Sequence, residues 1–522
     1  MERASQELAG TATPANLEPR GRVRRAAWAY LAGVLYTIAT ILAGFVATPI
    51  LLRLLGGERL GSFRVMGEWL GYLTVVDVGL TSALPVFLLR AYSGTDPHAP
   101  RALTRYGLRL MSAVAAIVML PLGLLFTWFC PRLIPVSASM VGELRLAALI
   151  TLGSILLYPI GIFRANLEVT QRGYVVTLGL LAQSLVTTGL GLGLAYLGFR
   201  LPGQALASVL GLVVASLIWA WSVRRAMPPG VAASPLPTRS ALWRTSWPFA
   251  LSGMGNRLNV MTDSMVVAAF LGPIAVTTLF LTQRVISLAG GQVNGLAVVS
   301  WPALLELRAR GERDAFERRL SELTTLLITL GITLTGTVAA YNKHFMNLWV
   351  GAAYDGGPLL ALFTALGSII FGFVCLFAWV IDMQGDTRHR LRVSTVGSVL
   401  NLLFSVLAVR AIGVPGVALG TLAAYLCTDA WYCPTLVCRR YDVRPRVIVV
   451  AIVRAVAFGV PWVTGVWILA SVHVPPFRWV GLLAEEGALA CAGLTYCWLA
   501  VFTPEDRRLW KARFAGLLRR AA

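Results

Sequence analysis

The chain has 522 residues, of which 57% are hydrophobic and 13% are charged, and its formal net charge is +21. A mean hydropathy of +0.72 excludes the soluble and disordered classes and indicates a polytopic membrane protein. The positive charge does not indicate nucleic-acid binding, because Lys and Arg are concentrated in every second connection between successive apolar runs.

The first 25 residues are polar, with a basic end, and we interpret them as a disordered cytoplasmic tail. They are not a signal peptide, because the apolar run that follows is about twice as long as a signal-peptide core. The next runs are each long enough to cross a hydrocarbon core of about 30 Å. They lie near residues 26–52, 62–89, 103–129, 144–166, 174–197 and 203–222, and we assign residues 26–222 to an N-terminal lobe.

A proline-rich segment, residues 223–245, follows and is predicted to be a cytoplasmic linker. Residues 246–438 form a predicted C-terminal lobe, with runs near 246–270, 274–303, 319–341, 357–381, 391–411 and 414–437. Residues 439–504 add a further pair of runs, and residues 505–522 form a basic cytoplasmic tail. The sequence thus predicts an all-α membrane protein with about 14 transmembrane helices.

The distribution of Lys and Arg predicts the orientation of these spans. With a cytoplasmic N-terminus, 33 of the 45 basic residues lie in inside segments and 9 in outside segments. This is the positive-inside rule, and it places both termini in the cytoplasm. The remaining three, Arg257, Arg284 and Arg454, lie within spans, and Arg454 is interpreted as a snorkelling anchor near the start of its span.

The two lobes are predicted to be copies of one another. Landmark residues recur at near-constant offsets of 216, 217 and 213: Leu55-Gly56 with Leu271-Gly272, Pro85 with Pro302, and Pro202-Gly203 with Pro415-Gly416. Because six spans separate the copies, both lobes have the same orientation in the membrane. This predicts two parallel six-helix lobes followed by an appended helical pair.

Two local motifs point to a family. The segment Leu54–Phe63 reads LLGGERLGSF, and the segment Val76–Leu80 reads VDVGL. Together they resemble motifs of the polysaccharide-transporter branch of the multidrug/oligosaccharidyl-lipid/polysaccharide (MOP) exporter superfamily, which contains O-antigen flippases. Twelve of the fourteen predicted spans fit the resemblance; the extra pair departs from the twelve-span O-antigen flippases and is similar to the lipid II flippases, so the branch stays open.

The resemblance implies a MATE-like fold whose lobes enclose a cavity that opens alternately to either side of the bacterial inner membrane. It further implies a polyprenyl-diphosphate-linked oligosaccharide as cargo, with cationic cavity residues that hold the diphosphate. No resident cofactor is expected, and coupling by H⁺ or Na⁺ is open. Expected partners are the lipid-linked cargo, membrane lipids and the polysaccharide polymerase and chain-length machinery, but not nucleic acid.

Polar residues inside the spans are the candidate substrate-binding groups. Arg284, Ser287 and Asn294 share one face of the predicted helix 274–303, because they are spaced by three and seven residues. Arginine suits a diphosphate because its planar fork donates two parallel hydrogen bonds. The span before it carries Asn256, Arg257, Asn259 and Asp263, which line the cavity or, for Arg257 and Asp263, form a structural ion pair.

Four further charged residues lie in the first two spans. Asp77 is either a coupling or gate carboxylate or a structural anchor at a helix contact. Arg64 and Glu68 are four residues apart and form either a local salt bridge or part of an outer gate. Arg53, at the outer end of the first span, either snorkels or contacts phosphate.

The leading functional prediction is a non-enzymatic flippase for lipid-linked oligosaccharide in surface polysaccharide biosynthesis. A lipid II flippase and a cation-coupled multidrug exporter are the alternatives from the same superfamily, and the excess of intramembrane arginine disfavours cationic drugs. A polytopic glycan polymerase or ligase is the alternative from another class, and the short outer loops disfavour it.

Overall fold

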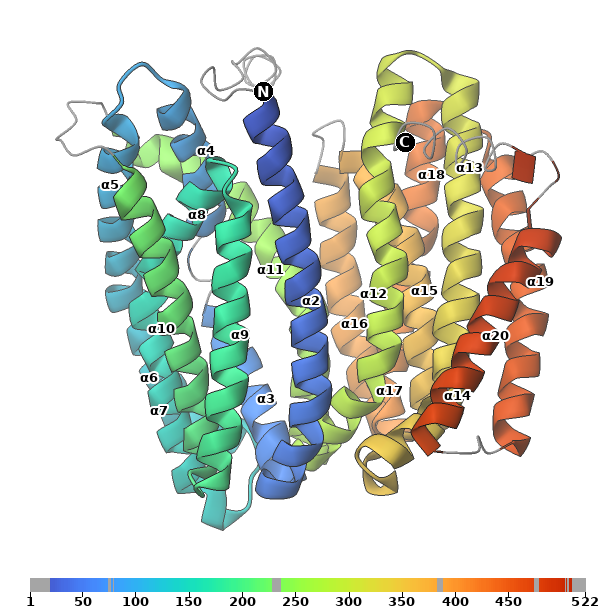
Figure 1. Ribbon diagram of the computed structural model, residues 1–522, viewed down its shortest axis with the longest axis horizontal. Helices are drawn as coiled ribbons and strands as arrows, with labels where there is room; N and C mark the ends of the chain where they lie inside the picture. The colour runs from blue at the N-terminus through green and yellow to red at the C-terminus, as the bar shows by residue number, and fades with distance from the viewer. Residues whose placement is uncertain are drawn as a thin grey trace. The chain divides into compact units, whose positions relative to one another are not determined.

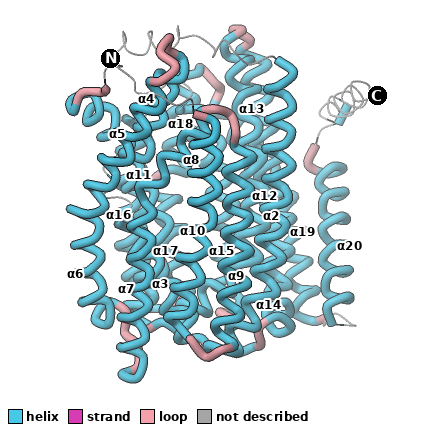
Figure 2. The backbone as a smooth tube through the Cα atoms, turned by 60° about the vertical axis from the view of Figure 1, so that its left-hand side comes forward, coloured by secondary structure: helices cyan, strands magenta, loops and turns pink. Residues whose placement is uncertain are grey.

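The computed structural model describes residues 19–73, 77, 79–227, 236–382, 388–473, 478–502, 504 and 507–508. Within these helices, the side chains of residues 19–27, 248–249, 251–261, 382, 388–391 and 478 are outside the described set. All the regular structure in the described residues is helical, as Figure 2 shows. The all-α prediction is therefore confirmed.

The chain divides into two compact units, Met1–Arg257 with Gly272–Ile274, and Leu258–Leu271 with Ala275–Ala522. The helices of the first unit are α2 (Pro19–Leu55), α3 (Gly57–Tyr72), α4 (Leu80–Ser93), α5 (Ala99–Val114), α6 (Leu120–Leu133), α7 (Val141–Leu157), α8 (Gly161–Val169), α9 (Gly173–Tyr196) and α10 (Arg200–Ala226). Helix α11 (Arg239–Leu271) belongs to both units. The lobe and linker boundaries predicted from the sequence stay predictions.

The second unit contains α12 (Pro273–Ala309), α13 (Arg313–Leu330), α14 (Gly336–Trp349), α15 (Gly357–Asp382), α16 (Arg388–Ile412), α17 (Pro415–Cys427), α18 (Asp429–Tyr441), α19 (Pro445–Val472) and α20 (Arg478–Ala500). Short 3₁₀ turns occur at Ala138–Met140, Tyr158–Ile160 and Ala352–Tyr354, and π-helical turns at Ala115–Met119 and Gly331–Thr335.

In the first unit, α10 packs along α9 and α7, and α4 packs against α5 and α8. Figure 1 shows α9 and α10 side by side. The core beside α4 and α8 is built from large apolar side chains, among them Leu84, Leu88, Met111 and Ile162, each at most 1% exposed. Many other apolar side chains are exposed on the outer faces of these helices, as expected where lipid is the solvent.

In the second unit, the appended helix α19 lies along α13 and α14, and α20 also contacts α14 (Figure 1). Small residues allow this close approach. A Cβ atom on Gly336 would come within 2.4 Å of the Val463 side chain, and one on Gly459 within 3.0 Å of Ile332. The appended pair is therefore packed into the second unit.

The structure repeats two backbone features at the offset of 216 found in the sequence. Gly56 and Gly272, each between two helices, have positive φ values of 81° and 85°. The π-helical turn Ala115–Met119 recurs as Gly331–Thr335, in the third span of each predicted lobe. This agreement in backbone geometry supports the predicted duplication.

Ten helical segments in the described residues are long and apolar enough to span a membrane. The predicted count of fourteen is not confirmed, for identifiable reasons. The second span is interrupted between Tyr72 and Leu80, and the twelfth changes direction at Thr428 between α17 and α18. The seventh is described in full only from Thr262, and α20 carries the carboxylates Glu485 and Glu486.

Candidate functional site

The interruption of the second span is organised by Asp77. Its Oδ1 accepts a hydrogen bond from the Gly79 backbone N–H at 2.6 Å, and its Oδ2 accepts one from the Thr81 N–H at 3.2 Å. Gly79 has φ +75°, a left-handed conformation that costs glycine little. Asp77 thus satisfies the first amide groups of α4, as a helix N-cap does.

A second interrupted span meets the first at this point. Tyr158 begins the 3₁₀ turn between α7 and α8, and its hydroxyl donates to Asp77 Oδ2 at 3.3 Å. The π-helical turn of the third span packs here as well, with Ala115 and Met119 against Leu152 and Ile155. Three interrupted or distorted spans therefore meet beside one carboxylate, and discontinuous helices of this kind form transport sites in many carriers.

A pocket of about 780 Å³ opens beside the Asp77–Tyr158 contact, within the first unit. This volume is in the range of small-molecule sites. Its polar lining includes Arg164, which pairs with Glu168 (Nε to Oε1, 2.8 Å) and lies 6.0 Å from the Trp219 ring centroid. Its other lining residues include Thr81, Ser82, Gln183 and Ser216.

The second unit holds a cluster of oxygen atoms around Thr421. The Thr421 hydroxyl lies 3.0 Å from Asp263 Oδ2 and 3.1 Å from Asn401 Oδ1. Ser405 Oγ lies 3.0 Å from the same Asn401 oxygen and 3.4 Å from the Val417 carbonyl. Asn401 and Ser405 are 2% and 0% exposed, so this cluster is enclosed by the unit.

Close packing of α16 against α17 builds this cluster. A Cβ atom on Gly420 would come within 2.4 Å of Ser405, so only glycine fits there. The cluster contains one carboxylate, one amide and two hydroxyls, so its formal net charge is −1. The atoms that meet in it are all oxygens. Such a set fits a proton or a hard monovalent cation, and the described residues contain no cluster of three or more His, Cys, Asp and Glu ligands.

The structure places the other predicted residues on separate elements. Arg284 lies on α12 with its guanidinium carbon 5.6 Å from the Phe280 ring centroid. Ser287 and Asn294 follow on the same continuous helix, and the buried Asn294 side-chain oxygen has no hydrogen-bond partner among the side chains that the structure describes. The backbones of Asn256, Arg257 and Asn259 lie in α11, but their side chains are outside the described set.

Arg53 is exposed in the last turn of α2. Arg64 and Glu68 form an ion pair on α3, with Nε and Oε1 3.2 Å apart, which is the local salt bridge that their spacing predicts. Sequence reasoning missed Tyr158, Arg164, Asn401 and Thr421. Arg164 and Asn401 carried a signal, since a guanidinium or a primary amide within an apolar run stands out as the aspartates did.

Comparison with known proteins identifies the family. The family described as "Polysaccharide biosynthesis protein" matches residues 27–308, which is more than half of the chain. The chain belongs to this family. The resemblance to the polysaccharide-transporter branch of the MOP superfamily, stated from the motifs near Gly56 and Asp77, is thereby confirmed.

A curated relative of this polysaccharide biosynthesis protein is the uncharacterized membrane protein EpsK of Bacillus subtilis (strain 168), 22% identical over 485 residues, or 90% of this chain and 94% of EpsK. Among solved structures, the lipid II flippase MurJ in an inward closed conformation matches with a TM-score of 0.68 at 14% identity, over 89% of this chain and 99% of MurJ. The Vibrio cholerae MATE transporter VcmN matches with a TM-score of 0.53 at 15% identity, over 82% of this chain and 99% of VcmN. These likenesses establish a MOP-type fold.

Proposed function

We propose that this protein translocates a polyprenyl-diphosphate-linked oligosaccharide across the bacterial cytoplasmic membrane by alternating access, for surface polysaccharide biosynthesis. The membership in the polysaccharide biosynthesis family supports the class of cargo. The observation that carries transport is the meeting of two interrupted spans at Asp77 and Tyr158, beside a pocket of about 780 Å³. An interruption at this depth serves no purpose in a helix that only anchors the chain.

Arg284 is proposed as a diphosphate contact, with Ser287 and Asn294 on the same helix and with Arg257, Asn256, Asn259 and Arg53 as further cargo contacts. The buried Asn294 side-chain oxygen, which has no partner within the described part of the chain, supports this role, since a buried polar atom costs free energy until a hydrogen bond satisfies it. In the same proposal, Arg64 and Glu68 belong to an outer gate.

The cluster of oxygen atoms around Thr421, which includes the Asp263 carboxylate, is the proposed coupling site, with H⁺ or Na⁺ as the coupling ion. Its carboxylate lies 3.0 Å from the Thr421 hydroxyl, which in turn lies 3.1 Å from the Asn401 amide oxygen, and its residues come from three helices, α11, α16 and α17. A cation bound there ties the three helices together, so that its arrival and departure change their packing. The Arg257–Asp263 pairing remains the alternative structural role.

A direct test uses the full-length protein in liposomes, with a fluorescent polyprenyl-diphosphate disaccharide and chemical quenching of the outer leaflet. We expect Arg284→Ala to lower the translocation rate about tenfold, the effect of about 1.4 kcal/mol of lost binding in the transition state. Arg284→Lys keeps the positive charge but lacks the planar guanidinium, and its translocation rate is expected to lie between those of the wild type and Arg284→Ala. The control Arg446→Gln removes an exposed arginine at the start of α19 and is expected to match the wild type.

Equal rates for the wild type and Arg284→Ala would contradict the diphosphate contact. The same assay with lipid II as cargo separates the two flippase alternatives, and a preference for lipid II over the disaccharide lipid would replace the proposed cargo. A fluorescent cationic drug serves as the third cargo; its transport would favour the multidrug exporter.

A further inference from the structure

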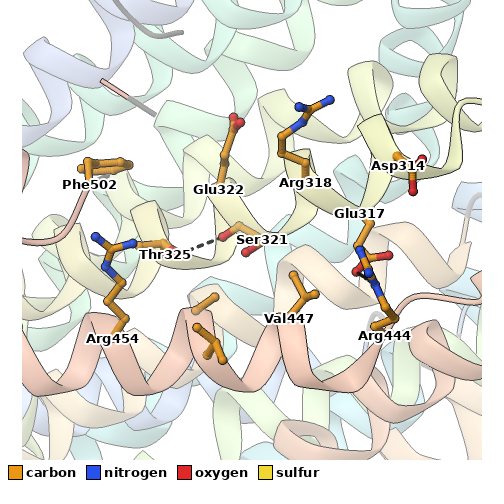
Figure 3. Close-up of a pocket in the computed structure, with 12 residues that line it drawn as sticks. Asp314, Glu317, Arg318, Ser321, Glu322, Thr325, Arg444, Val447, Arg454 and Phe502 are labelled. Carbon is orange, nitrogen blue, oxygen red and sulfur yellow. Dashed lines mark hydrogen bonds and ion pairs between the residues drawn. The ribbon is translucent and has the colours of Figure 1, made fainter. Parts of the chain in front are cut away.

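A second polar pocket, of about 250 Å³, lies in the second unit between the first turns of α13 and α19. Figure 3 shows its side chains converging from these two helices, with Phe502 closing one end. Both helices begin at this end of the unit, and the distribution of arginines predicts that the end faces the cytoplasm. The lining includes Asp314, Glu317, Arg318, Glu322, Arg444 and Arg454.

Arg454 is a cation of this pocket that has no partner among the described residues. It lies nine residues beyond Pro445, the first residue of α19, and therefore about 13 Å along the helix. It is half-buried, and among the described residues it has no ion pair, hydrogen bond or aromatic contact. The interpretation as a snorkelling anchor at the start of a span is therefore wrong in position, because the side chain lines a pocket (Figure 3).

The carboxylates of the pocket do not neutralise Arg454, because two of them have other partners. Glu317 pairs with Arg444 (Oε1 to Nε, 2.8 Å), and Glu322 pairs with Arg319 (Oε2 to Nη1, 2.9 Å). The hydrogen bond from Arg444 to Glu317 raises the pKa of Arg444, and each of the two charges is compensated by the other. Asp314 is exposed and lies beside Glu317 and Arg444, at the opposite end of the pocket from Arg454 (Figure 3).

We propose that this pocket binds the phosphate of a phospholipid from the cytoplasmic leaflet, with Arg454 as its principal contact. An arginine within a span is costly, and a phosphate oxygen offsets that cost through charge-assisted hydrogen bonds. Arg318, which also lines the pocket and is exposed, adds a second cation near the same phosphate. Basic pockets between helices at this face are typical sites for lipid headgroups.

Two features favour a membrane phospholipid over a soluble anion or the cargo. Val450, on the same helix, is 53% exposed on the surface that faces lipid, so acyl chains have an apolar path out of the pocket. The volume of about 250 Å³ holds a headgroup but not an oligosaccharide. The proposal does not depend on the proposed flippase function.

The test is native mass spectrometry of the full-length protein in detergent, titrated with phosphatidylglycerol. We expect one saturable lipid whose affinity falls about tenfold in Arg454→Gln and changes less than about threefold in Arg454→Lys. The matched control, Arg446→Gln, removes an exposed arginine from the same helix outside the pocket and is expected to bind as the wild type does. Equal lipid affinity in the wild type and Arg454→Gln would overturn the proposal.

Two further measurements keep the result decisive. Val447→Trp fills the pocket without removing a charge, so it is expected to abolish the saturable lipid even if Arg454→Gln proves unstable; unchanged binding would overturn the site. Inorganic phosphate is the competitor that separates the sources of the anion. We expect no displacement of the lipid by millimolar phosphate, and full displacement would assign the pocket to a soluble anion instead.

Discussion

Asp77 and Asp263 are both aspartates within apolar runs, and their surroundings give them different roles. Both oxygens of Asp77 accept backbone N–H groups, at 2.6 and 3.2 Å, which is the arrangement of a helix cap. Asp263 contacts side-chain oxygens instead, the hydroxyl of Thr421 and through it the amide of Asn401. In the proposed function, Asp263 can therefore exchange a coupling ion, whereas Asp77 is committed to the backbone of α4.

This difference predicts opposite phenotypes for two substitutions. Asp263→Asn is expected to abolish the dependence of translocation on an imposed H⁺ or Na⁺ gradient while the protein stays folded, because the amide is nearly isosteric but uncharged. The measurement is translocation in vesicles with each gradient in turn. The exposed Glu306→Gln is the control, expected to keep the wild-type response. A gradient response that survives in Asp263→Asn would contradict the coupling site.

At the scale of elements, the informative features are the interruptions of the spans. The hydrophobic runs of the sequence predicted where helices cross the bilayer, and ten of them are continuous and apolar enough to do so. The break at Asp77 was not predicted, because a run such as Val76–Leu80 is equally apolar in a straight helix. An interruption of a helix depends on which side chains satisfy the backbone amide groups that it leaves without partners. One such contact at Asp77 is made by Tyr158, which lies 81 residues further along the sequence.

The break itself can be tested by stability. Asp77→Ala removes both acceptors from the start of α4 and is expected to lower stability by about 1 kcal/mol. Gly79→Ala is expected to cost a similar amount, because a residue with a Cβ is strained at φ +75°. Thermal unfolding in detergent measures both. Asp77→Ser, which can still cap, is the matched control; wild-type stability in Asp77→Ala together with lost coupling would instead favour a coupling carboxylate at this position.

At the scale of the whole molecule, composition was sufficient for the polytopic all-α class, since mean hydropathy is summed over many residues, whereas the MATE-like fold was implied by the resemblance of the motifs near Gly56 and Asp77. The candidate site was predictable only in part. Charged residues such as Arg284 and Asp263 stand out against an apolar background, while Tyr158 and Thr421 do not, because tyrosine and threonine are ordinary in spans. Partners that lie far apart in sequence meet only in the folded chain.

The predicted orientation is a property of the whole chain and is directly testable. With 33 basic residues in inside segments and 9 in outside segments, we expect both termini in the cytoplasm. A green fluorescent protein fused to either end should then fluoresce, and alkaline phosphatase fused there should be inactive. Active phosphatase at either terminus would contradict the assignment, and fusions after the predicted outer connections provide the positive control.

The two π-helical turns bear on the evolutionary origin of the two lobes. A π turn closes its hydrogen bonds over one residue more than an α-helical turn, and such turns are rare, so their recurrence at corresponding positions calls for a common origin. The turn lies at Ala115–Met119 and again at Gly331–Thr335, at the repeat offset of 216. One ancestral event before the duplication accounts for both with fewer steps than two separate events. On the predicted duplication, we infer that the irregular turn is older than the two-lobed chain.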